Sequence, residues 1–193
     1  MKTSLFVLFS LGLAVMSTST PASGAEMIIK DPTRHSDYLV ELEPHLSTIF
    51  WRRTIHRRYV IIDAEAGQPE FGGGVRAHFE IVDPVIPSLN NSIALGTGVD
   101  FMSCSTYCTE PVQVFLPVNA QWNFYLTDKW SAYANIGAVL RTTDFFSNTF
   151  GDFVTELGGR YHFNDKIVLN LRVGYPYSVT VGPGFYLGSR DGK

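Results

Sequence analysis

The sequence predicts an all-β protein, an eight-stranded antiparallel up-and-down β-barrel that spans a membrane. Three observations predict it: eight segments alternate apolar and other residues with period two, these segments are long, and one face of each lacks charge. The stretch "VQVFLPVNAQWNFYLTDKWSAYANIGAVL", residues 112–140, holds two such segments around three polar residues. An ordinary strand runs roughly 5–6 residues, whereas a tilted strand needs roughly 9–11 residues to cross hydrocarbon. Bilayer thickness therefore accounts for the length of these segments.

The N-terminus has the features of a secretory signal. Lys2 precedes an apolar run over residues 5–16, and Ser23-Gly24-Ala25 supplies small residues for cleavage after Ala25. We therefore predict a signal peptide over residues 1–25, Sec-type export, and one barrel domain over residues 26–193. No later run approaches the roughly 20 apolar residues that a spanning helix needs. The formal net charge of −3 gives no reason to expect nucleic acid as a partner.

The first four segments cover residues 38–50, 74–81, 93–101 and 112–126. Each carries an uncharged apolar face, as expected where a strand meets lipid. These faces hold, in chain order, Tyr38, Val40, Leu42, Leu46, Phe50; Val75, Ala77, Phe79, Ile81; Ile93, Leu95, Val99, Phe101; and Val114, Leu116, Val118, Trp122, Phe124, Leu126.

The last four segments cover residues 130–141, 153–163, 167–175 and 177–187, and they repeat the pattern. Their apolar faces hold Ala132, Ala134, Ile136, Ala138, Leu140; Phe153, Leu157, Tyr161, Phe163; Ile167, Leu169, Leu171, Val173, Tyr175; and Val179, Val181, Phe185, Leu187. Eight such segments are an even number, as in bacterial membrane barrels.

The opposite faces gather the charged and ionisable side chains. They carry Glu41, Glu43, His45, Arg76, His78, Glu80, Asp100, Arg141, Glu156, Arg160, His162 and Arg172. A soluble lipocalin-like barrel has an apolar interior and a charged exterior, whereas a membrane barrel inverts this arrangement. Lysines outside the signal are few and include Lys129, Lys166 and Lys193 at turns or the terminus, which favours the membrane barrel. Because an eight-stranded interior is just wide enough for side chains, we predict a network of paired charges in the lumen. A narrow path for water or ions lined by the same groups is the alternative.

Aromatic residues gather near two short connections, residues 127–129 and 164–166. Trp122, Phe124, Tyr125 and Trp130 surround the first, and Tyr161 and Phe163 precede the second. Aromatic girdles mark the membrane interfaces of such barrels. With the N-terminus in the periplasm, these turns and residues 82–92 are periplasmic. Residues 51–73, 102–111 and 142–152, with a very short connection around Pro176, form the outer loops.

On this architecture, and on the stretch "LPVNAQWNFYLTDKWSAYANIGA", the chain resembles the small eight-stranded outer-membrane barrels of Gram-negative bacteria, the OmpA/OmpX/OmpW-like group. The resemblance covers residues 38–187. It implies a porin-like barrel in the outer membrane that the barrel-assembly machinery inserts. Members of the group end on an aromatic residue, which Phe185 would match, but here the chain continues through "YLGSRDGK".

Candidate chemistry in the sequence is sparse. The histidines at 45, 78 and 162 lack tight ligand spacing, so we predict no metal site and no cofactor. No G-x-S-x-G is present, and Ser147 has no histidine beside it, so we predict no enzymatic activity. We expect a monomer with a structural or surface-interaction role. A narrow channel for ions or small solutes is the second reading, and a soluble periplasmic ligand-binding barrel is the third.

Two features fall in predicted outer loops. Cys104 and Cys108, in "CSTYC", are predicted to form a disulfide, the default in an oxidising compartment. The run "WRRTIHRR" contains Arg52, Arg53, Arg57 and Arg58, which could bind the phosphates of lipopolysaccharide because arginine matches phosphate bidentately. A solvated basic loop is the equal alternative.

Overall fold

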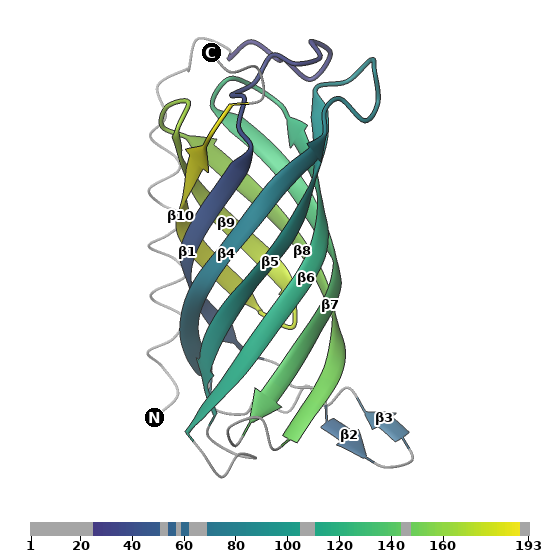
Figure 1. Cartoon of the computed structure of the whole chain (residues 1–193), viewed down its shortest axis with the longest axis vertical. Helices are drawn as coiled ribbons and strands as arrows, with labels where there is room; N and C mark the ends of the chain where they lie inside the picture. The colour runs from purple at the N-terminus through teal and green to yellow at the C-terminus, as the bar shows by residue number, and fades with distance from the viewer. Residues whose placement is uncertain are drawn as a thin grey trace, which may run out of the picture.

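The computed structural model describes residues 25–50, 54–56, 59–61, 69–104, 111–143 and 148–189. Eight antiparallel strands close into a barrel in the order β1-β10-β9-β8-β7-β6-β5-β4, and β1 closes it by pairing with β4 (Figure 1). The strands are β1 Val40–Ile49, β4 Glu70–Val82, β5 Asn91–Ser103, β6 Val112–Tyr125, β7 Trp130–Thr143, β8 Asn148–His162, β9 Ile167–Tyr175 and β10 Val179–Leu187. The predicted fold class, a closed antiparallel barrel of eight strands, is confirmed. Within the described residues, no helix has the length and apolar character to cross a membrane.

Several predicted boundaries were wrong. β4 begins at Glu70, four residues earlier than predicted, because Gly72 and Gly73 pair with β1 although glycine shows no apolar alternation. β8 begins at Asn148 rather than 153, and β10 begins at Val179 rather than 177. The predicted outer connection 51–73 also contains a two-stranded sheet, β2 Thr54–His56 and β3 Tyr59–Ile61. Hydrogen bonding to the neighbouring strands sets where a strand ends. The alternation of apolar residues within one segment carries no information about those neighbours.

The two ends of the barrel differ. We call the end with the turns 127–129 and 164–166 the turn end, and the end with β2 and β3 the loop end. Residues 25–39 lie across the turn end in Figure 1, where Ile28 N donates to Leu126 O at 2.9 Å and Asn90 N donates to Ile29 O at 2.8 Å. Met27 also bridges Thr127. The segment before β1 is therefore fastened to the strands that it covers.

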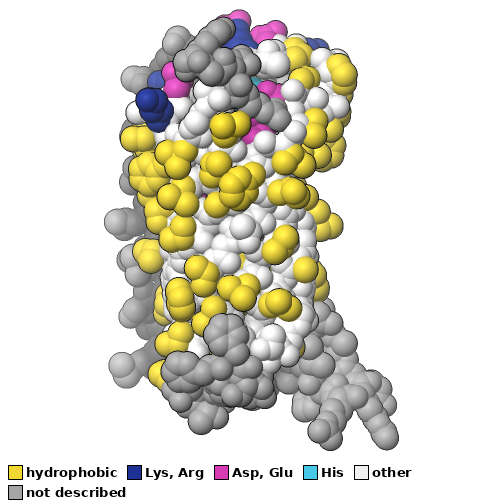
Figure 2. Space-filling view, viewed as in Figure 1, with side chains coloured by type: hydrophobic (Ala, Val, Ile, Leu, Met, Phe, Trp, Pro, Cys, Tyr) yellow, Lys and Arg dark blue, Asp and Glu magenta, His cyan; other side chains and the backbone are white. Residues whose placement is uncertain are grey.

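The distribution of side chains is the inverse of that in a soluble globular protein, with apolar side chains outside and charged side chains inside. Ile136, Leu46 and Leu157 are 71%, 69% and 66% exposed on the outer wall, whereas Arg160 and Arg172 inside are at most 1% exposed. Figure 2 shows apolar side chains spread over the barrel wall and charged side chains gathered at its upper end. Because each strand alternates its side chains, the uncharged face of the sequence becomes the outer wall.

Exposed aromatic rings form two belts. At the turn end, Trp130 contacts Tyr161 and Tyr161 contacts Phe163, with ring centroids 5.0 and 5.1 Å apart. Toward the loop end, Phe71, Phe101, Phe150 and Phe153 are exposed. On β8 the eight residue-to-residue steps from Phe153 to Tyr161 span about 27 Å along the strand, or about 21 Å along the axis at a tilt of about 40°. That separation is close to the apolar band of about 25 Å in membrane barrels.

Two aromatic residues that we predicted for the outer surface instead face inward. Tyr38 is fully buried and stacks on Tyr186, with ring centroids 4.1 Å apart, because the chain enters the barrel mouth before β1 begins. Tyr125, predicted in the girdle, is 1% exposed and shares the inward face with Asn123. The aromatic cluster around residues 127–129 is thus divided between the outer belt and the lumen.

Candidate functional site: the ion-paired interior and the turn-end pocket

The middle of the lumen holds a central ion cluster, formed by Glu43, His45, Arg76, Asp100, Glu156 and Arg172. Arg76 donates to Glu156 Oε2 at 3.0 Å and to Asp100 Oδ2 at 3.3 Å. Arg172 lies 2.7 and 3.1 Å from the two carboxylate oxygens of Glu43, and its Nε is 3.8 Å from Glu156 Oε2. All of these side chains are at most 1% exposed. Buried charges must be paired. Because Arg76 of β4 pairs with Glu156 of β8, the cluster links strands on opposite sides of the barrel.

A second level lies nearer the turn end. Arg160 NH2 is 2.7 Å from Glu41 Oε2, and the Arg160 guanidinium also donates to Asn170 Oδ1 and Asn123 Oδ1, both at 2.9 Å. Asn170 in turn donates to Glu41 Oε1 at 2.8 Å. The guanidinium carbon lies 4.5 Å from the centre of the Tyr133 ring, which adds a cation–π contact.

Arg141 belongs to a third, separate level at the loop end, whereas we had predicted one network. It donates to Gln113 Oε1 at 3.1 Å and lies 4.0 Å from Asp152. Its guanidinium stacks over Phe115, and Phe115 packs on Tyr177, whose ring lies under Arg76. These two rings separate Arg141 from the central ion cluster.

The predicted lumen histidines occupy three different settings. His45 Nε2 lies 2.8 Å from Asp100 Oδ1 in the central ion cluster. His78 is fully buried, and neither of its ring nitrogens has a hydrogen-bond partner within the described part of the chain. His162 Nε2 lies 2.9 Å from Ser131 Oγ at the turn end. The structure does not bring the three together.

The Ser131–His162 pair brings a hydroxyl to a histidine ring nitrogen, as a nucleophile and its base require. A hydrolytic triad also needs a carboxylate on the other ring nitrogen. The polar side-chain contact of His162 within the described residues is with Ser131 rather than with a carboxylate, and Ser131 is 2% exposed. The pair is a buried hydrogen bond between β7 and β8.

Interior aromatic rings are the feature that sequence reasoning missed. Phe115, Tyr133 and Tyr177 fill the lumen beside the charged levels, Tyr186 stacks on Tyr38 nearer the turn end, and the Tyr177 hydroxyl donates to Asp100. Phe115 and Tyr133 alternate in phase with the inward-facing polar residues of their own strands, and this phase was the sequence signal that they face the lumen. Tyrosine suits this position because its ring fills volume while its hydroxyl meets polar neighbours.

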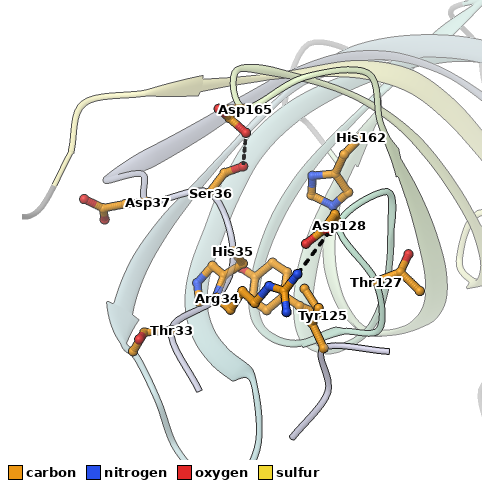
Figure 3. Close-up of a pocket in the computed structure, with 11 residues that line it drawn as sticks. Thr33, Arg34, His35, Ser36, Asp37, Tyr125, Thr127, Asp128, His162 and Asp165 are labelled. Atoms are coloured by element: carbon orange, nitrogen blue, oxygen red, sulfur yellow. Dashed lines mark hydrogen bonds and ion pairs between the residues drawn. The ribbon is translucent and has the colours of Figure 1, made fainter. Parts of the chain in front are cut away.

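A pocket of about 490 Å³ opens at the turn end (Figure 3). Its lining includes Arg34, His35, Tyr125, Asp128 and His162. His35 stacks on Tyr125, with ring centroids 3.7 Å apart and planes 6° apart. Burial lowers the pKa of His35, and the Asp83 carboxylate and a hydrogen bond that His35 makes to Asn90 Oδ1 offset only part of that effect.

Glu80, predicted in the lumen network, lies at this end instead of with the central ion cluster. Its Oε1 is 4.0 Å from His35 Nε2, and Asp83 Oδ2 is 3.5 Å from the same nitrogen. His35 was not among the predicted site residues, because it precedes the first alternating segment.

Some predicted features fall outside the described residues. These are residues 1–24 of the signal peptide predicted over residues 1–25, the four arginines Arg52, Arg53, Arg57 and Arg58, and Cys108, the predicted disulfide partner of Cys104. They stay predictions.

No protein-family model matches the chain, and no curated protein matches it. Among solved structures, the chain is similar to the attachment invasion locus protein Ail of Yersinia pestis, at 10% identity and a TM-score of 0.45, over 78% of this chain and 98% of that one. It is likewise similar to Ail in complex with the heparin analogue sucrose octasulfate, at 11% identity and a TM-score of 0.45, over 76% of this chain and 98% of that one. The likeness concerns the barrel fold alone.

Proposed function

We propose that this protein is a non-enzymatic integral barrel of the outer membrane with a closed, side-chain-filled interior and a structural or surface-interaction role. The observation that carries the proposal is the inverted distribution of side chains. Residues such as Ile136 and Leu46 are largely exposed on the wall while Arg76 and Arg160 are fully buried. An apolar wall of this extent, bounded by two aromatic belts, suits hydrocarbon and would promote aggregation in water.

A soluble ligand-binding barrel, the third reading of the sequence, fits poorly with this wall. Such a barrel encloses its ligand in an apolar interior. Here the interior is crossed by three levels of charged side chains, with Arg160, Arg76 and Arg141 at successive depths. There is little apolar volume in which a lipophilic ligand would be held.

The same three levels support a plug rather than a channel. Guanidinium groups reach across the lumen to carboxylates on distant strands, as Arg76 of β4 does to Glu156 of β8. Rings of Tyr133 and Tyr177 occupy the space beside those guanidinium groups. An eight-stranded barrel leaves little bore once such side chains are in place.

Conductance of the purified protein in a planar lipid bilayer tests the proposal. A plugged barrel inserts without discrete current steps above background. Reproducible, ion-selective steps from the unmodified protein would replace this proposal with the channel reading.

The partners proposed with this function are outer-membrane lipid, the barrel-assembly machinery during insertion, and lipopolysaccharide phosphates at the arginine-rich loop. We propose a monomer, since a closed barrel leaves no unpaired strand edge.

A further inference from the structure

Three side chains with metal-binding atoms converge at the turn end. His35 comes from the segment before β1, Glu80 from β4, and Asp83 from the connection that follows it. Their nitrogen and oxygen donors all lie within 4.8 Å of one another. We propose that His35, Glu80 and Asp83 bind a divalent transition-metal ion of the Zn²⁺ type, at a site that the sequence did not predict.

The orientation of the His35 ring is fixed by groups outside this trio. Asn90 Nδ2 donates to the carbonyl oxygen of Arg34 at 2.9 Å, which directs its Oδ1 toward His35 Nδ1 at 2.7 Å. Because Oδ1 can only accept, Nδ1 must carry the proton. In the neutral ring Nε2 is then unprotonated, and it is the nitrogen that faces the two carboxylates. Metal-ligating histidines commonly donate their other N–H to a protein acceptor in this way, and the stack on Tyr125 holds the ring plane.

The distances fit an ion between the donors better than direct bonds among them. Nε2 lies 3.5 Å from Asp83 Oδ2 and 4.0 Å from Glu80 Oε1, both too long for a good hydrogen bond. Ligands about 2.0–2.2 Å from a tetrahedral Zn²⁺ stand about 3.3–3.6 Å apart. The donors lie within 4.8 Å of one another, so the Glu80 carboxylate would move toward the other two ligands to complete that spacing. Three protein ligands would leave one position for water or another ligand.

Burial and charge point the same way. The side chains of His35 and Glu80 are 4% and 1% exposed, and that of Asp83 is 15% exposed. Two carboxylates beside an imidazole, at a site this far shielded from solvent, favour the binding of a cation. The lowered pKa of His35 favours the neutral ring, which is the form that binds metal. Imidazole with carboxylate is a ligand set suited to Zn²⁺ and related ions rather than to Mg²⁺.

Binding would join the segment before β1 to the β4–β5 connection. A backbone hydrogen bond of 2.8 Å from Asn90 N to Ile29 O already links these parts. A metal ion would add a second link at the mouth of the barrel, beside the pocket that His35 also lines.

The test uses the mature protein folded in detergent micelles and titrated with Co²⁺, followed by competition between Zn²⁺ and a chromophoric chelator. The variants are His35→Gln and Asp83→Asn. Asp31→Asn is the matched control for Asp83→Asn, because Asp31 lies in the same segment before β1 as His35 but its side chain is 50% exposed and pairs with Arg34. We expect one Co²⁺ equivalent with visible d–d bands that Zn²⁺ displaces and excess Mg²⁺ does not. Zn²⁺ affinity should fall about tenfold or more in both variants and stay unchanged in the control.

Heat-modifiable gel migration verifies that each variant is folded. If His35→Gln does not fold, Asp83→Asn, at the more exposed position, decides the result. Absence of Zn²⁺ binding to the unmodified protein, unchanged affinity in folded Asp83→Asn, or equal displacement by Mg²⁺ would overturn the proposal. None of these outcomes bears on membrane insertion or conductance.

Discussion

Replacing Glu41 with glutamine should destabilise the barrel more than the same replacement of Glu156. Both carboxylates are buried, and glutamine keeps their shape while removing the charge. The difference lies in what each arginine retains. Within the described residues, Glu41 is the one carboxylate at ion-pair distance from Arg160. Without it, Arg160 keeps only neutral partners such as Asn170.

After loss of Glu156, each of its two arginines still has another carboxylate as a partner. Arg76 keeps Asp100 at 3.3 Å, and Arg172 keeps Glu43 at 2.7 Å. Breaking a buried ion pair by removing one partner costs about 3–5 kcal/mol. We therefore expect about 5 kcal/mol for Glu41→Gln and about 3 kcal/mol for Glu156→Gln.

Urea unfolding of protein folded in lipid vesicles measures the difference, with the fluorescence of Trp122 and Trp130 at the turn end as the signal. Asp128→Asn is the control, because its side chain is 64% exposed and an exposed pair with Arg34 contributes about 0–1 kcal/mol. A cost for Glu41→Gln no larger than that for Glu156→Gln would mean that an unpaired Arg160 charge does not set the difference. If neither variant differs from the control, the ion pairs do not hold the barrel together.

Three further predictions concern location, the lipid-facing wall and interior packing. The protein should fractionate with the outer membrane and migrate on gels in a heat-modifiable way; recovery from the periplasm without detergent would contradict the membrane assignment. Ile136→Arg, midway between the aromatic belts, should cost about 2–4 kcal/mol in folding into lipid, against about 0–1 for Leu187→Arg near an interface, and equal costs would mean that the wall does not meet hydrocarbon. Gly158→Ala should cost about 1–3 kcal/mol in urea unfolding because the added Cβ would meet the Tyr133 ring at 2.2 Å, whereas Gly151→Ala, with nothing within 4 Å, should be near neutral. If Gly158→Ala costs the same when Tyr133 is already alanine, that steric explanation is wrong.

The sequence by itself determined the barrel and its two surfaces. Alternation with period two assigned Leu157 to the wall and Glu156 to the lumen, because successive side chains of a strand point to opposite sides. The length of the uncharged faces indicated the bilayer. These are local properties of one strand, so they can be read without knowing its neighbours.

Only the tertiary structure decided which charges meet and where the interior is divided. Glu41 and Arg160 are 119 residues apart in the chain, and Arg76 reaches Glu156 across the lumen; both contacts depend on barrel closure and on the stagger between strands. The inward turn of Tyr38 and the meeting of His35 with Glu80 arise outside any alternating segment. Period two assigns a residue to a face but carries no information on its height in the closed barrel. Pairing partners depend on that height, which is set by the register of all eight strands together.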